Sequence, residues 1–104
     1  MRIAVTGGSG AIGRYVCDEF IQAGHETVSI DRMPPLNDRA FIEVDLRNLD
    51  DTCKKLEGFD QVVHLAAIPT AIPGKSVEII GDNTVTSFNV FEAVRLNGIR
   101  RVIY

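Results

Sequence analysis

The chain has 104 residues, of which 45% are hydrophobic and 24% are charged, and its formal net charge is −3 at pH 7. This length accommodates one domain with a modest core, and the slightly acidic balance argues against a nucleic-acid partner, because such partners favour a basic face. Two cysteines without metal-ligand spacing predict reduced thiols and no metal site. The sequence has no signal-peptide pattern and no apolar stretch of bilayer length, which predicts a cytoplasmic protein that does not enter membranes.

The N-terminal residues predict a strand, a glycine-rich turn and a helix in direct succession. Residues 3–5 are an apolar run typical of a buried parallel strand. Apolar residues then recur every four positions over residues 12–20 and predict an amphipathic helix that ends at Gly24. The turn between them has two readings, G-x-G-x-x-G starting at Gly8 or G-x-x-G-x-x-G starting at Gly7.

This arrangement is typical of a turn that holds a dinucleotide pyrophosphate. Glycines let the backbone turn tightly and approach phosphate oxygens without a Cβ in the way, and the following helix offers unpaired N–H groups and the positive end of its dipole. The next apolar run, residues 27–30, predicts a second strand that ends at Asp31, eighteen positions after Gly13, where an acidic residue binds a ribose. The alternative is a glycine-rich surface turn followed by an unrelated helix.

Strand and helix patterns alternate along the rest of the chain. We expect, in order, a loop at residues 33–38, a strand at 41–44 closed by Asp45, a helix at 48–57 with Asn48 as N-cap and Gly58 as its end, a strand at 61–67, a loop at 68–74, a helix from about 77 to 97 with an interruption near Gly81, and a strand from 101. This β-α-β alternation predicts an α/β fold, a doubly wound parallel sheet of the Rossmann type with strand order 3-2-1-4-5. Its ligand crevice is expected at the carboxyl ends of the first and fourth strands.

Five segments carry a resemblance to a known family. They are residues 6–13 (TGGSGAIG), 31–32 (DR), 45–47 (DLR), 64–67 (HLAA) and 83–93 (NTVTSFNVFEA). In this order and spacing they resemble the N-terminal, cofactor-binding part of the extended short-chain dehydrogenases/reductases, the NAD-dependent epimerase/dehydratase group. The last segment departs from the family pattern N-V-x-G-T-x-N-V-L-E-A, with Thr86 in place of glycine and Ser87 in place of threonine.

The resemblance implies a dinucleotide site and selects the reading of the turn that starts at Gly7. The residues that it implies as cofactor contacts are Gly7, Gly10, Ala11, Ile12, Gly13, Asp31, Arg32, Asp45, Leu46, Leu65, Ala66, Ala67 and Asn83. Asp31 would accept hydrogen bonds from the adenosine ribose and would repel the 2′-phosphate of NADP, so NAD is favoured. Arg32 and Arg14 have guanidinium groups that suit phosphate, which leaves NADP as the alternative.

Three residues of this region carry two interpretations each. Asp45 would contact the adenine amino group or cap the end of its strand. His64 lies within a strand, so we interpret it as a packed or hydrogen-bonded structural histidine rather than an acid–base catalyst. Asn83 would brace the neighbouring strand and the crevice through its amide, or serve as a plain helix N-cap. Ile68 and Pro69 are expected on the nicotinamide side.

The helix at residues 83–97 is apolar over a wide arc that includes Phe88 and Phe91. One face of this helix is expected to lie on the sheet. The resemblance implies that the remainder helps to form a homodimer, and core packing against a segment outside the chain is the alternative.

The chemistry of the family requires a Tyr-x-x-x-Lys pair, which this sequence lacks, since Tyr15 is followed four positions later by Glu19 and Tyr104 is the last residue. We therefore expect residues 1–104 to be the dinucleotide-binding domain of a longer enzyme, truncated after the fifth strand begins, with no catalytic residues and no activity of its own. The resemblance implies that the parent protein transfers a hydride between NAD and a nucleotide sugar or related hydroxy/carbonyl substrate. The alternatives are a non-catalytic dinucleotide-binding regulator or redox sensor, and a different Rossmann enzyme such as a methyltransferase.

Overall fold

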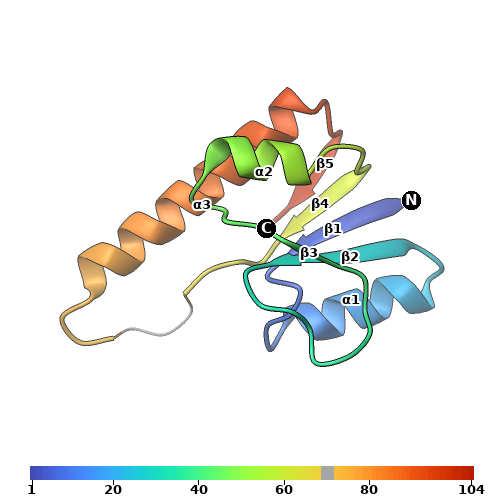
Figure 1. The fold of residues 1–104 in the computed structure, drawn as a ribbon, viewed down its shortest axis with the longest axis horizontal. Coiled ribbons are helices and arrows are strands. Elements are labelled where there is room, and N and C mark those ends of the chain that lie inside the picture. Colours follow the sequence, from blue (N-terminus) through green and yellow to red (C-terminus); the bar gives the residue numbers. More distant parts are fainter. Residues whose placement is uncertain (69–71) are drawn as a thin grey trace.

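The computed structural model describes residues 1–68 and 72–104, which form a parallel sheet flanked by helices (Figure 1). The strands are β1 (Arg2–Thr6), β2 (Glu26–Asp31), β3 (Phe41–Glu43), β4 (Gln61–His64) and β5 (Arg101–Ile103), and the helices are α1 (Gly13–Gln22), α2 (Leu49–Lys55) and α3 (Ser76–Leu96). The strand order is β3-β2-β1-β4-β5 with parallel pairing throughout. This order confirms the predicted Rossmann-type fold.

The two faces of the sheet bury different side chains, because successive residues of a strand point to opposite faces. Ile3 and Val5 of β1 belong to one apolar cluster with Cys17 of α1. Ala4 belongs to a larger cluster that includes Val90 of α3. Accordingly, α1 covers one face of the sheet, and α2 and α3 cover the other (Figure 1).

Several predicted boundaries differ from the observed ones by one to three residues, and one predicted interruption is absent. β4 ends at His64 rather than at residue 67, because its pairing with β1 ends where Thr6 pairs with His64, and the N–H of Leu65 bonds back to the Thr6 carbonyl. β3 ends at Glu43, one residue early. The predicted interruption of the last helix at Gly81 is wrong, since α3 continues through it. A single glycine costs a helix only about 1 kcal/mol relative to alanine, which the packing of the remaining turns offsets.

The helix ends follow the predicted signals. The Asn48 side chain caps α2 by accepting the N–H of Asp51 at 2.9 Å. Gly24 and Gly58, which follow α1 and α2, have φ angles of 89° and 81°, a conformation that favours glycine. In the part of the chain that the structure describes, no helix combines the length and the apolarity that crossing a bilayer requires.

Candidate functional site

A crevice of about 450 Å³ opens at the carboxyl ends of β1 and β4, where the strand order reverses. All thirteen residues that the sequence predicted as cofactor contacts line it, namely Gly7, Gly10, Ala11, Ile12, Gly13, Asp31, Arg32, Asp45, Leu46, Leu65, Ala66, Ala67 and Asn83. Ile68, expected on the nicotinamide side, lines it as well. Pro69, predicted beside Ile68, lies outside the described residues.

Sequence reasoning missed four lining residues, which are Val44, Arg47, Asp82 and Thr86. Thr86 lies three positions after Asn83 and four positions after Asp82 on α3, and residues three and four apart share a helix face. That spacing was available in the sequence as a signal. Arg47 belongs to a segment that the resemblance had already singled out, so its side chain could also have been included.

The glycines of the turn have two different structural roles. Gly7 has a φ of 70°, and a Cβ there would lie 2.9 Å from the Ala66 backbone. A Cβ on Gly13 would collide with the Gly7 carbonyl oxygen. By contrast, a Cβ on Gly8 would lie 2.7 Å from Ser29 Oγ on β2, and Gly8 does not line the crevice. The geometry therefore favours the reading of the turn that starts at Gly7.

The N-terminus of α1 offers free hydrogen-bond donors to the crevice. Among the described residues, the N–H groups of Ala11, Ile12 and Gly13 donate to no acceptor, and no side chain caps the helix. These groups lie at the positive end of the helix dipole. An anion in the crevice would therefore find both hydrogen-bond donors and a favourable field at this point.

The carboxylate of Asp31 is held in place at the end of β2. Its Oδ1 accepts the N–H groups of Arg32 at 2.7 Å and Met33 at 3.3 Å, and its Oδ2 accepts the N–H of Ser9 at 3.3 Å. The side chain is partly buried and lines the crevice. Backbone donors thus fix the carboxylate between the glycine turn and the adjoining loop, where it remains able to accept further hydrogen bonds.

Asp45 fits both of the interpretations that the sequence left open. It lines the crevice, and its Oδ1 accepts the backbone N–H of Arg47 at 3.1 Å in a turn at the strand end. The Arg47 guanidinium donates to the same oxygen at 3.2 Å. The backbone and side-chain hydrogen bonds from Arg47 lower the pKa of Asp45 below its usual value. Arg47 and Arg32 are both exposed at this end of the crevice.

Two asparagines of α3 hold the loops that form the crevice wall. The Asn83 Oδ1 accepts the N–H of Ile68 at 2.9 Å, and its Nδ2 donates to the Ile68 carbonyl at 3.3 Å. Asn83 lies inside α3, so the N-cap interpretation is wrong and the brace is correct. Asn89 is buried and donates from Nδ2 to the Leu46 carbonyl at 2.8 Å. Sequence reasoning did not find this second contact, because the two residues are 43 positions apart.

His64 is a buried structural histidine, as predicted. Its Nδ1 lies 2.7 Å from Thr6 Oγ1, and its Nε2 lies 3.1 Å from Ser87 Oγ. The side chain packs at an angle of 73° to the Phe91 ring. Burial lowers the pKa of His64 below its usual 6.5. His64 does not line the crevice but lies directly before the residues that do.

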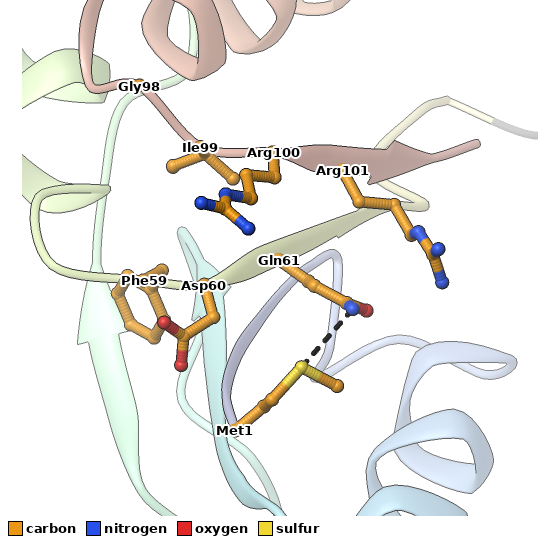
Figure 2. Close-up of a pocket in the computed structure, with 8 residues that line it drawn as sticks. All are labelled: Met1, Phe59, Asp60, Gln61, Gly98, Ile99, Arg100 and Arg101. Carbon is orange, nitrogen blue, oxygen red and sulfur yellow. Dashed lines mark hydrogen bonds between the residues drawn. The ribbon is translucent and has the colours of Figure 1, made fainter.

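A second cavity, of about 490 Å³, lies at the opposite ends of β4 and β5 (Figure 2). Its lining includes Asp60, Arg100 and Arg101, but no part of the glycine turn or of a helix N-terminus. The Asp60 carboxylate already accepts the N–H of Arg2 at 2.7 Å. Figure 2 shows the guanidinium groups of Arg100 and Arg101 pointing apart, so they do not converge on one ligand. The crevice at the carboxyl ends is therefore the candidate functional site.

Comparison with known proteins agrees with this geometry. The family model described as NAD dependent epimerase/dehydratase family matches residues 3–104. GDP-mannose 3,5-epimerase 1 of Oryza sativa subsp. japonica is 33% identical over an alignment that covers 100% of this chain and 30% of that protein. The crystal structure of UDP-N-acetylglucosamine 4-epimerase from Bacillus cereus is 34% identical with a TM-score of 0.88, and the match covers 100% of this chain and 36% of that chain.

A further solved structure, MoeE5 in complex with UDP-glucuronic acid and NAD, is 29% identical with a TM-score of 0.84, and the match covers 98% of this chain and 35% of that chain. The chain thus spans between 30% and 36% of the length of these three relatives. The family match extends over almost the whole chain, and both the strand order and the glycine turn agree with it. The chain therefore belongs to the NAD-dependent epimerase/dehydratase family of short-chain dehydrogenases/reductases.

Proposed function

We propose that residues 1–104 form the dinucleotide-binding domain of an NAD-dependent epimerase/dehydratase and that NAD binds in the crevice at the carboxyl ends of β1 and β4. The observation that carries the proposal is the group of free N–H donors at Ala11, Ile12 and Gly13, beside a turn in which added Cβ atoms would meet backbone. A pyrophosphate requires donors and close backbone approach of this kind.

The residues of the crevice fit each part of the dinucleotide. The diphosphate would lie over the turn from Gly7 to Gly13 and the N-terminus of α1, and the Asp31 carboxylate would accept hydrogen bonds from the adenosine ribose. The adenine would lie beside Asp45 and Leu46. The nicotinamide would face residues 65–68. In support, MoeE5, a structural relative, binds NAD.

Asp31 favours NAD over NADP in this proposal. A carboxylate accepts hydrogen bonds from ribose hydroxyls, whereas a 2′-phosphate in the same place would put two negative charges in contact. Arg32 and Arg47 stand at the same end of the crevice and would reduce this repulsion. NADP therefore remains the weaker ligand rather than an excluded one.

We further propose that the parent protein transfers a hydride between NAD and a nucleotide sugar or a related hydroxy/carbonyl compound. NAD supplies the hydride acceptor of such a reaction, and this chain binds and orients it. The relatives named above are two nucleotide-sugar epimerases and a protein that binds UDP-glucuronic acid. Because no tyrosine of the sequence is followed four positions later by lysine, the catalytic pair would lie outside residues 1–104.

The test of this proposal is calorimetric titration with NADH and NADPH. Asp31→Ala should weaken NADH binding about tenfold or more, since hydrogen bonds to a charged group contribute roughly 1.5–3 kcal/mol. NADPH binding should fall less, because removing the Asp31 carboxylate also removes its repulsion of the NADPH 2′-phosphate. Asp38→Ala, which removes the same charge from an exposed loop position, is the matched control. Equal losses for both dinucleotides in Asp31→Ala would overturn the preference for NAD.

A further inference from the structure

A chain of three polar side chains lies directly behind the crevice wall. Thr6 at the end of β1 contacts His64 at the end of β4, with 2.7 Å between Thr6 Oγ1 and His64 Nδ1. His64 in turn contacts α3, with 3.1 Å between its Nε2 and Ser87 Oγ. Thr6 is 0% exposed and His64 is 7% exposed. Three elements that meet at the crevice are therefore joined through one imidazole.

The hydrogen bonds around Thr6 determine where the proton of this imidazole lies. Thr6 Oγ1 accepts the N–H of Ala66 at 3.2 Å and the N–H of Leu65 at 3.1 Å, and the Thr6 carbonyl oxygen also accepts the Leu65 N–H at 3.1 Å. A hydroxyl oxygen has two acceptor positions and one proton to donate. Both acceptor positions are in use, so the Thr6 hydroxyl donates to His64 Nδ1. The imidazole must then carry its own proton on Nε2, which donates to Ser87.

The two backbone groups that Thr6 holds belong to the crevice itself. Leu65 and Ala66 line it, and the Ala66 backbone lies 2.9 Å from the place where a Cβ of Gly7 would stand. The glycine turn and the segment after β4 are therefore in close contact at Gly7 and Ala66. The Thr6 hydroxyl thus bonds to the Ala66 backbone, which lies beside Gly7 of the glycine turn.

We propose that Thr6, His64 and Ser87 form a positioning brace that holds residues 65–66 against the glycine turn only while His64 is neutral with its proton on Nε2, so that protonation of His64 releases this wall and weakens dinucleotide binding. The binding readout rests on the proposed function, whereas the brace itself does not.

Protonation places a second N–H on the imidazole, directed at Thr6 Oγ1. That oxygen already accepts two backbone N–H groups, so it must release one of them to accept a third donor. The contacts of His64 come from Thr6 on β1 and from Ser87 and Phe91 on α3, and the Tyr104 phenol packs in turn against the Phe91 ring. Burial is the cause that lowers the pKa of His64 and favours its neutral form.

The first test reads the proton position by nitrogen NMR of the imidazole. The chain has two histidines, so His25→Gln leaves His64 as its sole imidazole signal. At about pH 7.5, the proposal predicts a neutral ring with the proton on Nε2, and Thr6→Val should abolish the preference for this tautomer. A ring protonated on Nδ1, or a tautomer mixture unaffected by Thr6→Val, would overturn the brace.

The second test follows amide exchange while His64 is titrated. As the imidazole ionises, the protection factor of the Ala66 amide should fall with the same midpoint, while that of Val28 in β2 is retained. Thr6→Val should lower Ala66 protection at every pH, and Thr6→Ser, which keeps the hydroxyl, should restore it. Simultaneous loss at both amides, or no loss at Ala66, would overturn the proposal.

The third test measures NADH affinity above and below the midpoint of His64 ionisation that the NMR titration gives. Affinity should fall about five- to tenfold, the equivalent of one released hydrogen bond, and His64→Gln, which cannot ionise, should remove the pH dependence. His25→Gln should leave it unchanged. A pH dependence that survives His64→Gln would overturn the coupling. If no variant binds NADH at any pH while the first two tests hold, the proposed function fails and the brace stands.

Discussion

Gly13 occupies a position where the turn itself leaves no room for a side chain. A Cβ there would collide with the Gly7 carbonyl oxygen and would lie 2.7 Å from the Gly8 Cα. These are backbone atoms, so they cannot move aside as a flexible side chain would. We predict that Gly13→Ala lowers the free energy of unfolding by about 1–3 kcal/mol, measured by urea denaturation. An unchanged unfolding midpoint would show that the turn tolerates a methyl group and that steric closeness does not explain this glycine.

His64 should make the stability of the fold depend on pH. Burial lowers its pKa in the folded chain below 6.5, so between that lowered value and 6.5 the unfolded chain binds more protons than the folded chain does. The free energy of unfolding is therefore fully retained above this interval and falls as the pH decreases through it. The lowered pKa values of Asp45 and Glu92 act at more acidic pH, because their usual values are already 3.8 and 4.5.

Chemical denaturation at several pH values between about 5 and 7.5 measures this slope. His64→Gln should flatten it, and His25→Gln should retain it. If the slope of His64→Gln equals that of the unmodified protein, another group is responsible and the assignment to His64 is wrong.

At the scale of single residues, the sequence predicted whether a side chain is buried better than it predicted which residues that side chain contacts. His64 lies in a strand of a central sheet, and this alone indicated a structural role. Its partners Thr6 and Ser87 lie 58 and 23 positions away in the sequence, and only the completed sheet brings them together. The sequence does not decide between the two roles of Asn83 for the same reason, since the tertiary fold is what brings Asn83 to its partner Ile68.

At the scale of elements, α3 shows how packing overrides a local signal. Gly81 lies within this helix, is exposed, and has open space around the position of a Cβ. We predict that Gly81→Ala raises the free energy of unfolding by about 0.5–1 kcal/mol, measured by the same urea denaturation. It is the matched control for Gly13→Ala, because the same change from glycine to alanine should raise the free energy of unfolding at Gly81 and lower it at Gly13. A destabilised Gly81→Ala variant would indicate that α3 is not a continuous helix there.

The sequence predicted every strand and helix of the described chain, but some of their ends only approximately. Glycines and the Asn48 cap are local signals, so α1 and α2 end and begin where expected. The end of β4 depends instead on how far its neighbour β1 extends, and β1 ends at Thr6. The length of a pairing depends on both strands, so the apolar pattern of residues 65–67 alone cannot show that they leave the strand and form the crevice wall.

At the scale of the whole molecule, the strand order was predictable because parallel strands joined by helices have few allowed topologies. The same order places the glycine turn, the end of β2 and the segment after β4 at one edge of the sheet, so the lining of the crevice could be predicted with it, while its role in cofactor binding stays a prediction.

One part of the wide apolar arc of α3 packs on the sheet as predicted, and the partner of the other part is not identified. Val90, Ala93 and Val94 are buried against the sheet, whereas Phe88 is 59% exposed. Whether a second copy or another segment covers Phe88 stays a prediction, since both partners would bury the same face.

If a dinucleotide pyrophosphate binds at the N-terminus of α1, NADH titration followed by amide NMR will detect it there. The signals of Ala11, Ile12 and Gly13 should shift in proportion to occupancy, because their free N–H groups would become hydrogen-bonded. The signals of residues 98–101, which line the second cavity, should stay unchanged. Shifts confined to residues 98–101, or saturating NADH without any change at the three amides of the turn, would show that the pyrophosphate does not bind at this helix N-terminus.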